Sequence, residues 1–306
     1  MITVMGEALV DIIVDRQGEV TSVIGGAALN TARTVARLDI PASFLGGVSS
    51  DAFGQRIMRL LDADGVRLAL GHQVVEPTTL AIASLDAKGA ATYRFMMEGT
   101  SAAALTPQMA LDHVGPDCRA LHVGTLGLVM QPLVQASVAA VAAADAHQLV
   151  MVDPNCRPSV MTGSPVFGSA LDSVLARADV VKVSGDDLEF LFPGEGNLAS
   201  AIRLQSDTGA VVLFTDGAHA VHVLTAGRDV VLDVPRVAVV DTVGAGDSFS
   251  GGFLAYWLHE GLGRDDLADH ARVATAARFG IAVAGMTCQR PGADPPRAHE
   301  VPGGWR

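Results

Sequence analysis

The sequence has few lysines and few aromatic residues for a chain of 306 residues. Lys88 and Lys182 are its two lysines, so arginine carries nearly all of the positive charge. The 33 acidic residues outnumber the 21 basic ones, and the formal net charge is −12. A protein that binds nucleic acid or an anionic membrane usually presents a basic patch, so neither is expected as a partner. A local basic pocket for a phosphate remains compatible with this composition.

Cysteine is also scarce. The three cysteines are Cys118, Cys156 and Cys288. Their odd number and wide spacing fit neither a disulfide framework nor a metal site, which predicts buried thiols in a reducing cytosol. The sequence opens as MITVMGEALVDIIV, without a basic leader or a cleavage site. Asp145 and His147 interrupt the apolar stretch at 133–153 well short of a membrane span. We therefore expect a soluble, cytoplasmic protein.

Apolar residues are abundant at 49% of the chain, although only 5% of residues are aromatic. Alanine, valine and leucine must therefore fill a sizeable core. After residue 100, short apolar runs alternate with helical patterns, as is typical of a parallel sheet covered on both faces. Right-handed βαβ crossovers would join them into a doubly wound α/β fold. The predicted strands cover 119–124, 149–153, 179–184 and 210–216, and the first predicted helices between them cover 131–147 and 164–178.

Two regions break this alternation. Residues 12–24 are predicted to form a hairpin with Gln17-Gly18 at its turn, and residues 72–97 two or three strands with Lys88-Gly89 at a turn. Together they could form a small separate sheet, which would be a candidate lid over a site. An antiparallel extension of the main sheet fits the pattern equally well. No repeat, low-complexity tract or linker is evident, so a single domain over 1–306 is expected.

The stretch VVDTVGAGDSFSGGFLAYWLHE, residues 239–260, combines glycines with one carboxylate. VAVVD (237–241) is predicted as a strand and SFSGGFLAYWLHE (248–260) as a helix. Glycine would then lie at a helix N-terminus, where unpaired N–H groups and the helix dipole attract an anion. Asp247 falls near the N-cap, but a capping role alone does not require glycines before it. The predicted anion hole consists of Gly244, Ala245 and Gly246.

Other nucleotide-binding loops do not fit this stretch. A P-loop requires Gly-Lys-Ser/Thr, and neither lysine follows a glycine. The dinucleotide-binding fingerprint requires a third glycine where Phe249 stands. A carboxylate beside an anion hole suits phosphoryl transfer to an alcohol. Asp247 would take the proton of the attacking hydroxyl, while the amides of 244–246 would hold the γ-phosphoryl oxygens.

Two long motifs carry a resemblance to a known family. DTVGAGDSFSGGFL (241–254) resembles the C-terminal signature of the ribokinase-like carbohydrate kinases, also called the phosphofructokinase B family. GGAALNTARTVARLDIPASFLGGVSSDAFG (25–54) is similar to the N-terminal signature of that family. The resemblance spans nearly the whole chain in the right order. It implies a doubly wound α/β domain with a small β lid, and ATP and Mg²⁺ as cofactors.

The resemblance also implies roles for individual residues. Asp247 matches the catalytic base, and Gly244 to Gly246 match the anion hole. Without the resemblance, Asp11 would be interpreted as a strand-end cap and Asn30 as a polar residue of a first helical turn. Arg94 belongs to the predicted lid, which would close over the sugar and exclude water. The implied sugar-binding residues are Asp11, Gly26, Asn30 and Arg94.

Two further segments are implied to bind the nucleotide. VDPNCRPSV (152–160) resembles the D-P-N-x-R segment of fructokinases and related sugar-acid kinases. Arg157 could pair with ATP phosphates through its guanidinium fork, although a surface arginine would fit the pattern too. LFTDGAHAV (213–221) resembles the nucleotide loop of the family. It would place Thr215 and Gly217 near the phosphates or the ribose.

The implied cation sites are less complete. VKVSGDDLEFL (181–191) resembles the family's Asn-x-x-Glu segment, which is associated with Mg²⁺ and phosphate, but it has Ser184 and Asp187 at those two positions. Because Asp187 is one methylene shorter than glutamate, its expected contact with Mg²⁺ runs through water. A K⁺ ion near Asp241 and Val243 is implied by the resemblance alone.

The predicted activity is transfer of the γ-phosphoryl group of ATP to a primary hydroxyl of a sugar, with fructose preferred. The D-P-N-x-R segment and CQRPGA (288–293) resemble fructokinases most. Phosphorylation of 2-keto-3-deoxygluconate or ribose stays open. A nucleoside kinase would need an apolar clamp for the base, which the low aromatic content disfavours, and a non-catalytic sugar-binding protein could dispense with Asp247. Lid strands of this family often pair between subunits, so a homodimer through the lid is one implied arrangement.

Overall fold

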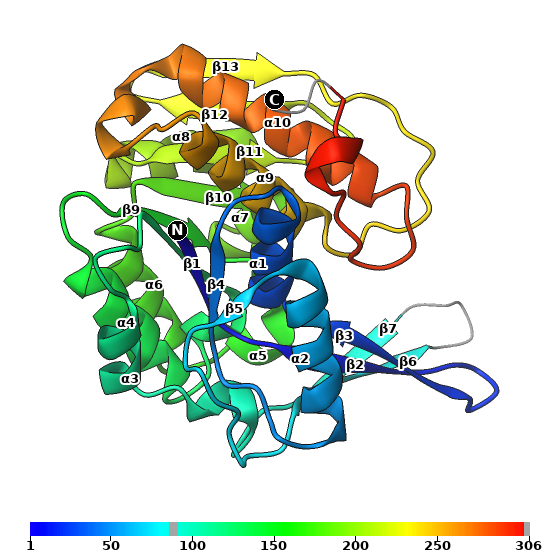
Figure 1. Cartoon of the computed structure of the whole chain (residues 1–306). Coiled ribbons are helices and arrows are strands. Elements are labelled where there is room, and N and C mark those ends of the chain that lie inside the picture. Colours follow the sequence, from blue (N-terminus) through cyan, green and yellow to red (C-terminus); the bar gives the residue numbers. More distant parts are fainter. Residues whose placement is uncertain (86–90, 303–306) are drawn as a thin grey trace.

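The buried apolar runs become the strands of one large sheet in the computed structural model, which describes residues 1–85 and 91–302 (Figure 1). Its order is β13-β12-β11-β10-β9-β8-β1-β4-β5. The strands from β11 to β5 in this order run parallel, and β12 and β13 are antiparallel additions at one edge. The four strands predicted after residue 100 are confirmed to within one residue at each end. The strands are β1 (Ile2–Met5), β4 (Ala42–Leu45), β5 (Arg67–Leu68), β8 (Ala120–Gly124), β9 (Leu149–Asp153), β10 (Val180–Ser184), β11 (Val211–Thr215), β12 (Val221–Thr225) and β13 (Arg228–Leu232).

Helices cover both faces of this sheet, which confirms the doubly wound arrangement. Because successive strand residues point to opposite faces, Met151 packs with the layer of α1, α2, α9 and α10, whereas Val150 and Val152 pack with that of α4 and α6. The helices are α1 (Ala27–Arg37), α2 (Ala52–Asp64), α3 (Pro107–His113), α4 (Leu133–Ala143), α5 (Pro158–Met161), α6 (Phe167–Leu175), α7 (Gly185–Leu191), α8 (Asn197–Thr208), α9 (Ala245–His259) and α10 (His270–Thr287). No helix of the described residues is long and apolar enough to cross a membrane.

Glycines inside α9 let it pack closely between α1 and α10. A methyl group on Gly251 would lie 2.6 Å from the Cβ atom of Thr34 in α1. One on Gly252 would lie 3.1 Å from the Cα atom of Gly280 in α10. These two glycines therefore serve helix packing, and only the pair at the start of α9 is left for an anion.

A separate small sheet has the order β3-β2-β6-β7 and projects from the side of the molecule (Figure 1). It consists of β2 (Leu9–Val14), β3 (Val20–Gly25), β6 (Thr79–Leu85) and β7 (Ala91–Met96). The predicted hairpin is confirmed, and Gly18 in its turn has a φ of 86°. The small sheet is therefore not an extension of the main sheet. The predicted Lys88-Gly89 turn lies outside the described residues.

One predicted strand is wrong. Residues 237–241 form a loop without strand pairing, in which Val239 and Val240 are 60% and 63% exposed. The backbone N–H groups of Val240 and Asp241 both donate to the carbonyl oxygen of Cys288, which follows α10. The apolar pattern resembles a strand, but no neighbouring strand is available to pair with it at this point of the chain.

Candidate active site

The predicted site residues gather where the parallel strands end. The carboxyl ends of β1, β8, β9, β10 and β11 share one edge of the large sheet. After β1 the chain goes to β4 on one side, while β8 lies on the other side, so the strand order reverses at β1. Ligands of open α/β sheets bind at such a reversal, beyond the carboxyl ends of the strands. Glu7, Asn155 and the start of α9 all meet at this edge.

The start of α9 differs in one detail from the prediction. Gly244, and not Asp247, is the N-cap, because it adopts a left-handed φ of 75°. Asp247 is the third residue of the helix. The first N–H groups of a helix have no intrahelical carbonyl partner. That of Ala245 nevertheless donates to the carbonyl oxygen of Thr242 at 3.2 Å, so the predicted anion hole would depend chiefly on the N–H groups of Gly244 and Gly246.

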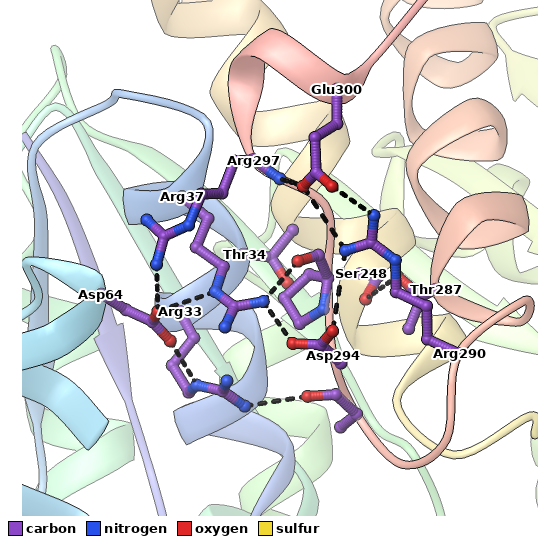
Figure 2. Close-up of polar contacts among 12 residues, drawn as sticks. Arg33, Thr34, Arg37, Asp64, Ser248, Thr287, Arg290, Asp294, Arg297 and Glu300 are labelled. Atoms are coloured by element: carbon purple, nitrogen blue, oxygen red, sulfur yellow. Dashed lines mark hydrogen bonds and ion pairs between the residues drawn. The ribbon is translucent and has the colours of Figure 1, made fainter. Parts of the chain in front are cut away.

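The segment after α10 packs against the predicted anion hole. A methyl group on Gly244 would lie 2.6 Å from the Cβ atom of Ala293, which explains the need for glycine there. Two arginines of α1 fix this segment: Arg33 donates to the carbonyl oxygen of Ala293 at 2.8 Å, and Arg37 pairs with Asp294. Figure 2 shows this arginine-rich contact between the two ends of the chain.

Asp247 is buried between two side-chain amides. Its Oδ2 accepts a hydrogen bond from Asn30 at 2.9 Å, and its Oδ1 lies 3.5 Å from the Nδ2 donor of Asn155. Asn155 has a φ of 39°, an uncommon value outside glycine that is often found at functional sites. Burial raises the pKa of Asp247, while the bond from Asn30 and the charges of Lys182 and Arg157 oppose that rise. Such a carboxylate is suited to accept a proton from an alcohol.

The sugar side of the site contains Asp11 and the Gly25-Gly26 pair. A methyl group on Gly25 would lie 2.3 Å from Oδ2 of Asp11, and one on Gly26 would lie 2.6 Å from the carbonyl oxygen of Glu7. Burial raises the pKa of Asp11 to about 6, and the charge of Arg157 acts in the opposite direction. The N–H of Asn30 donates to the carbonyl oxygen of Gly26 at 2.9 Å, so the two glycines connect the predicted sugar-binding residues Asp11 and Asn30.

Arg94 lies elsewhere. Residues paired across a sheet project from the same face, and successive residues from opposite faces. Asp11 pairs with Ala81, which pairs with Phe95. Arg94 precedes Phe95, so its exposed side chain lies on the other face of the small sheet from Asp11. Arg94 therefore does not lie beside Asp11 in the predicted sugar site. Its face depends on the register of β6 with β7, which the sequence does not reveal.

The residues assigned to the nucleotide reach the same edge of the sheet. Ser184 and Thr215 are paired in register at the ends of β10 and β11. Gly217 follows in a turn with a φ of 56°. Arg157 is half-buried, and its Nη1 donates to Asn155 Oδ1 at 2.7 Å and to the carbonyl oxygens of Asn155 and Cys156, both at 3.0 Å. Nη1 of Arg157 therefore stabilises the loop that carries this arginine.

Both carboxylate oxygens of Asp187 accept hydrogen bonds from the protein. Its Oδ1 accepts from the N–H of Cys156 at 2.6 Å, and its Oδ2 accepts from the N–H and the hydroxyl of Ser184 at 2.8 and 2.7 Å. It forms a capping box at the start of α7, which a sequence pattern cannot distinguish from a metal contact. Among residues 1–85 and 91–302, no group of three or more histidine, cysteine or acidic residues could hold a metal ion.

Asp241 connects two loops at this edge of the sheet. Its Oδ1 accepts from the N–H of Val243 at 3.0 Å, and its Oδ2 accepts from the N–H of Gly292 at 2.8 Å. It thus joins the loop before α9 to the segment after α10. Each carboxylate oxygen keeps further acceptor capacity.

Sequence reasoning missed two charged residues of the site. Oε1 of Glu7 accepts from the N–H of Ala27 at 2.9 Å, and burial raises the pKa of Glu7 to about 7. Lys182 lies 3.2 Å from Asp153, and a methyl group on Gly246 would lie 2.9 Å from the lysine Nζ. A lysine inside the apolar strand VVKVS was the signal available in the sequence.

Known proteins share this fold and much of this sequence. A family model described as pfkB family carbohydrate kinase matches residues 1–300. The chain is 34% identical over 260 residues to a fructokinase of Rhizobium leguminosarum bv. trifolii, covering 83% of this chain and 79% of that protein. The structure of the fructokinase with bound ATP from Xylella fastidiosa has a TM-score of 0.85 and 27% identity, covering 95% of this chain and 93% of that one. A fructokinase double mutant from Vibrio cholerae O395, in fructose, ADP and potassium ion bound form, has a TM-score of 0.81 and 26% identity over 95% and 93% of the two chains.

Proposed function

The chain belongs to the pfkB family of carbohydrate kinases, and we propose that it transfers the γ-phosphoryl group of ATP to a primary hydroxyl of fructose. One observation carries the proposal. A buried carboxylate, Asp247, stands in the first helical turn after Gly244 and Gly246, between the amides of Asn30 and Asn155. The fructokinases among the relatives support fructose as the acceptor, and the ATP-bound structure supports ATP as the donor.

In this proposal, Asp11 and Asn30 orient the sugar through its hydroxyls. Asp247 accepts the proton of the reacting hydroxyl, whose oxygen forms a bond to the γ-phosphorus. The bond between that phosphorus and the bridging oxygen of ADP breaks, and ADP leaves. The N–H groups at Gly244 and Gly246 stabilise the negative charge of the transferring group, an interaction that typically contributes about 10²–10³-fold in rate per donor.

The nucleotide is proposed to lie along the ends of β10 and β11. Ser184, Thr215 and Gly217 line this part of the sheet edge. The guanidinium nitrogens of Arg157 other than Nη1 would reach the phosphates. This arrangement places the γ-phosphoryl group at α9, between ADP and the sugar.

Cations enter the proposal in different ways. A divalent cation commonly accompanies ATP in phosphoryl transfer, but both carboxylate oxygens of Asp187 accept hydrogen bonds from the protein, so we assign the cation no protein ligand. A potassium ion would be held by Asp241 and the carbonyl oxygen of Val243. There it would supply positive charge close to the anion hole and hold the two flanking loops together.

The small sheet is proposed to act as a lid that also joins two subunits. Val20 and Met96, which project from one face of its strands, are 61% and 50% exposed. A second copy of the chain could cover this face, since exposed apolar surface often marks protein contacts. Sedimentation of the full chain would show a dimer, and a monomer at all accessible concentrations would contradict this part.

The activity is tested by measuring ADP formation with a panel of ketoses, aldoses, sugar acids and nucleosides. The reaction without acceptor gives the background hydrolysis. We expect fructose to give the highest kcat/KM, and mass spectrometry to find one added phosphoryl group on the sugar. A higher kcat/KM for 2-keto-3-deoxygluconate or ribose would replace the substrate and keep the kinase. Stimulation by no member of the panel would overturn the proposal.

A further inference from the structure

Lys182 is a charged residue in the middle of a buried strand. Its side chain is 4% exposed, and that of its partner Asp153 is 3% exposed. The register that pairs Val181 with Val152 sets Lys182, in the middle of β10, beside Asp153, the last residue of β9. The lysine Nζ lies 3.2 Å from Oδ2 and 3.4 Å from Oδ1 of Asp153. A buried pair of this kind is weak evidence for stability alone, because desolvation offsets most of the attraction.

The ion pair lies directly beneath the first turn of α9. A methyl group on Gly246 would lie 2.9 Å from the Nζ of Lys182, and Gly246 precedes Asp247. One turn further along the helix, the hydroxyl of Ser250 donates to Oδ2 of Asp153 at 3.3 Å. The ion pair thus contacts α9 at Gly246 and at Ser250, which precede and follow Asp247 in the sequence. Both contacts come from the side of the large sheet.

We propose that Lys182 is a positioning residue for phosphoryl transfer, whose buried charge keeps Asp247 ionised for proton acceptance while Asp153 holds the ammonium in place. This inference rests on the proposed function, because it takes Asp247 as the base. It gives a reason for a lysine at a position where an apolar residue would pack at lower electrostatic cost. It also gives a reason for glycine at 246, since any side chain there would displace the ammonium.

The other charges around Asp247 come from different elements. Arg157 follows β9 and is half-buried, and Glu7 follows β1 and is buried. Asn30 and Asn155, which bond to Asp247, are neutral. A fully buried ammonium is screened less by solvent than a half-buried guanidinium, so Lys182 contributes strongly to the field at Asp247.

Besides the acidic Asp187, His122 is a further titratable group near Lys182. It is 3% exposed, and neither ring nitrogen has a hydrogen-bond partner within the described part of the chain. Burial and the nearby charge of Lys182 lower the pKa of His122 to about 3. His122 is therefore neutral across the working pH range and does not compete with Lys182 as a counter-charge.

The test compares the pH dependence of kcat/KM for the best sugar between pH 5 and 9 in four full-length proteins. These are the wild type, Lys182→Met, Lys182→Arg and Asp153→Asn. Removing the ammonium should move the acid limb of the profile to higher pH, by about one unit or more. Asp153→Asn leaves the ammonium without its neutralising partner, so the limb should move to lower pH. Lys182→Arg keeps the charge and should keep the limb near that of the wild type.

Shifts of the acid limb in opposite directions for Lys182→Met and Asp153→Asn would distinguish this role from a purely structural one. Loss of a structural ion pair would lower the melting temperature and the active fraction, but it would leave the limb in place for both variants. If the wild type is active and the acid limbs of both variants coincide with its own, this inference alone is overturned. Shifts of both limbs in the same direction would also overturn it. If Lys182→Met does not fold, the near-isosteric Asp153→Asn still decides the question. A wild type without sugar phosphorylation would overturn the proposed function, and this inference with it.

Discussion

Two buried aspartates of this chain have opposite surroundings. Asp64, 5% exposed, accepts from the Nε atoms of Arg33 and Arg37, both at 2.7 Å (Figure 2). Asp247, 7% exposed, accepts instead from the neutral amides of Asn30 and Asn155. Asp64 also has Arg297 at 3.4 Å, whereas the cations near Asp247 make no direct bond to it among the described residues.

The difference is the one expected between a structural carboxylate and the proposed catalytic base. Guanidinium groups fit a carboxylate through a rigid fork, so Arg33 and Arg37 hold the Asp64 carboxylate in a fixed position. A general base must be able to take up a proton and release it again. Amide donors can orient Asp247 without fixing its charge. A nearby cation that is not bonded to Asp247, such as Lys182, can still lower its proton affinity.

The largest effect is expected from Asp247→Asn. Asparagine keeps the size of the side chain and one of its two acceptor oxygens, but it cannot accept the hydroxyl proton. We expect kcat/KM to fall by about 10²–10⁴-fold, with a melting temperature close to that of the wild type. Steady-state kinetics with the best sugar measure this, and the exposed Asp265→Asn serves as the control. Near-normal turnover of Asp247→Asn would remove Asp247 as the base.

Asp64→Asn should have the opposite effect from Asp247→Asn, lowering stability while the turnover number stays nearly the same. The change leaves Arg33 and Arg37 without their carboxylate in a buried setting, which costs about 3–5 kcal/mol of stability. The fraction that remains folded should keep a turnover number of the same order as the wild type. Urea unfolding measures the loss, and Asp62→Asn, exposed on the same helix, should be nearly neutral. A loss of turnover without a loss of stability would place Asp64 in the catalytic machinery.

Glu7→Gln tests how burial affects the pH dependence of stability. The folded pKa of Glu7 is about 7, above its value of 4.5 in the unfolded chain. The stability linked to its neutral form is therefore fully present below pH 4.5 and is lost as the pH rises through about 7. Relative to the wild type, Glu7→Gln should gain up to about 3 kcal/mol between pH 4.5 and 8. Unfolding curves of the two proteins that stay parallel over this range would contradict the prediction.

The smallest effect concerns two glycines with similar backbones. Gly244 and Gly18 both have left-handed φ values, 75° and 86°. A methyl group on Gly18 would meet nothing within 4 Å, whereas one on Gly244 would press on Ala293. Gly244→Ala should therefore be about 1–3 kcal/mol more destabilising than Gly18→Ala. It should also raise the KM for ATP, which Gly18→Ala should not do. Equal losses of stability for the two variants in thermal unfolding would show that Ala293 moves aside at little energetic cost.

Local patterns in the sequence predicted much of this protein. Apolar runs located the strands after residue 100 because a strand buried on both faces needs continuous apolar residues. The glycines before Asp247 located the start of α9, because a left-handed N-cap and a close approach both exclude a side chain. The resemblance to a kinase family then connected these motifs to a reaction, and the family is confirmed.

Other features were decided by pairing in space. Arg94 and Phe95 are neighbours in sequence, yet the register of β6 with β7 sends them to opposite faces. The valines of 237–241 look like a strand but have none beside them. Asp187 matched a metal-associated position, but Ser184 and the N–H of Cys156 occupy its oxygens.

The sequence alone determined which residues could start a helix, fill a strand or leave the backbone bare, because those properties depend on neighbours a few positions away. Only the tertiary structure decided which distant groups meet. Asn30 reaches Asp247 across 217 residues, and Lys182 lies beneath Gly246 because β10 ends where α9 begins its first turn. Such contacts depend on strand order and register, which no local pattern encodes. The electrostatic environment of the proposed base was therefore visible only in the folded chain.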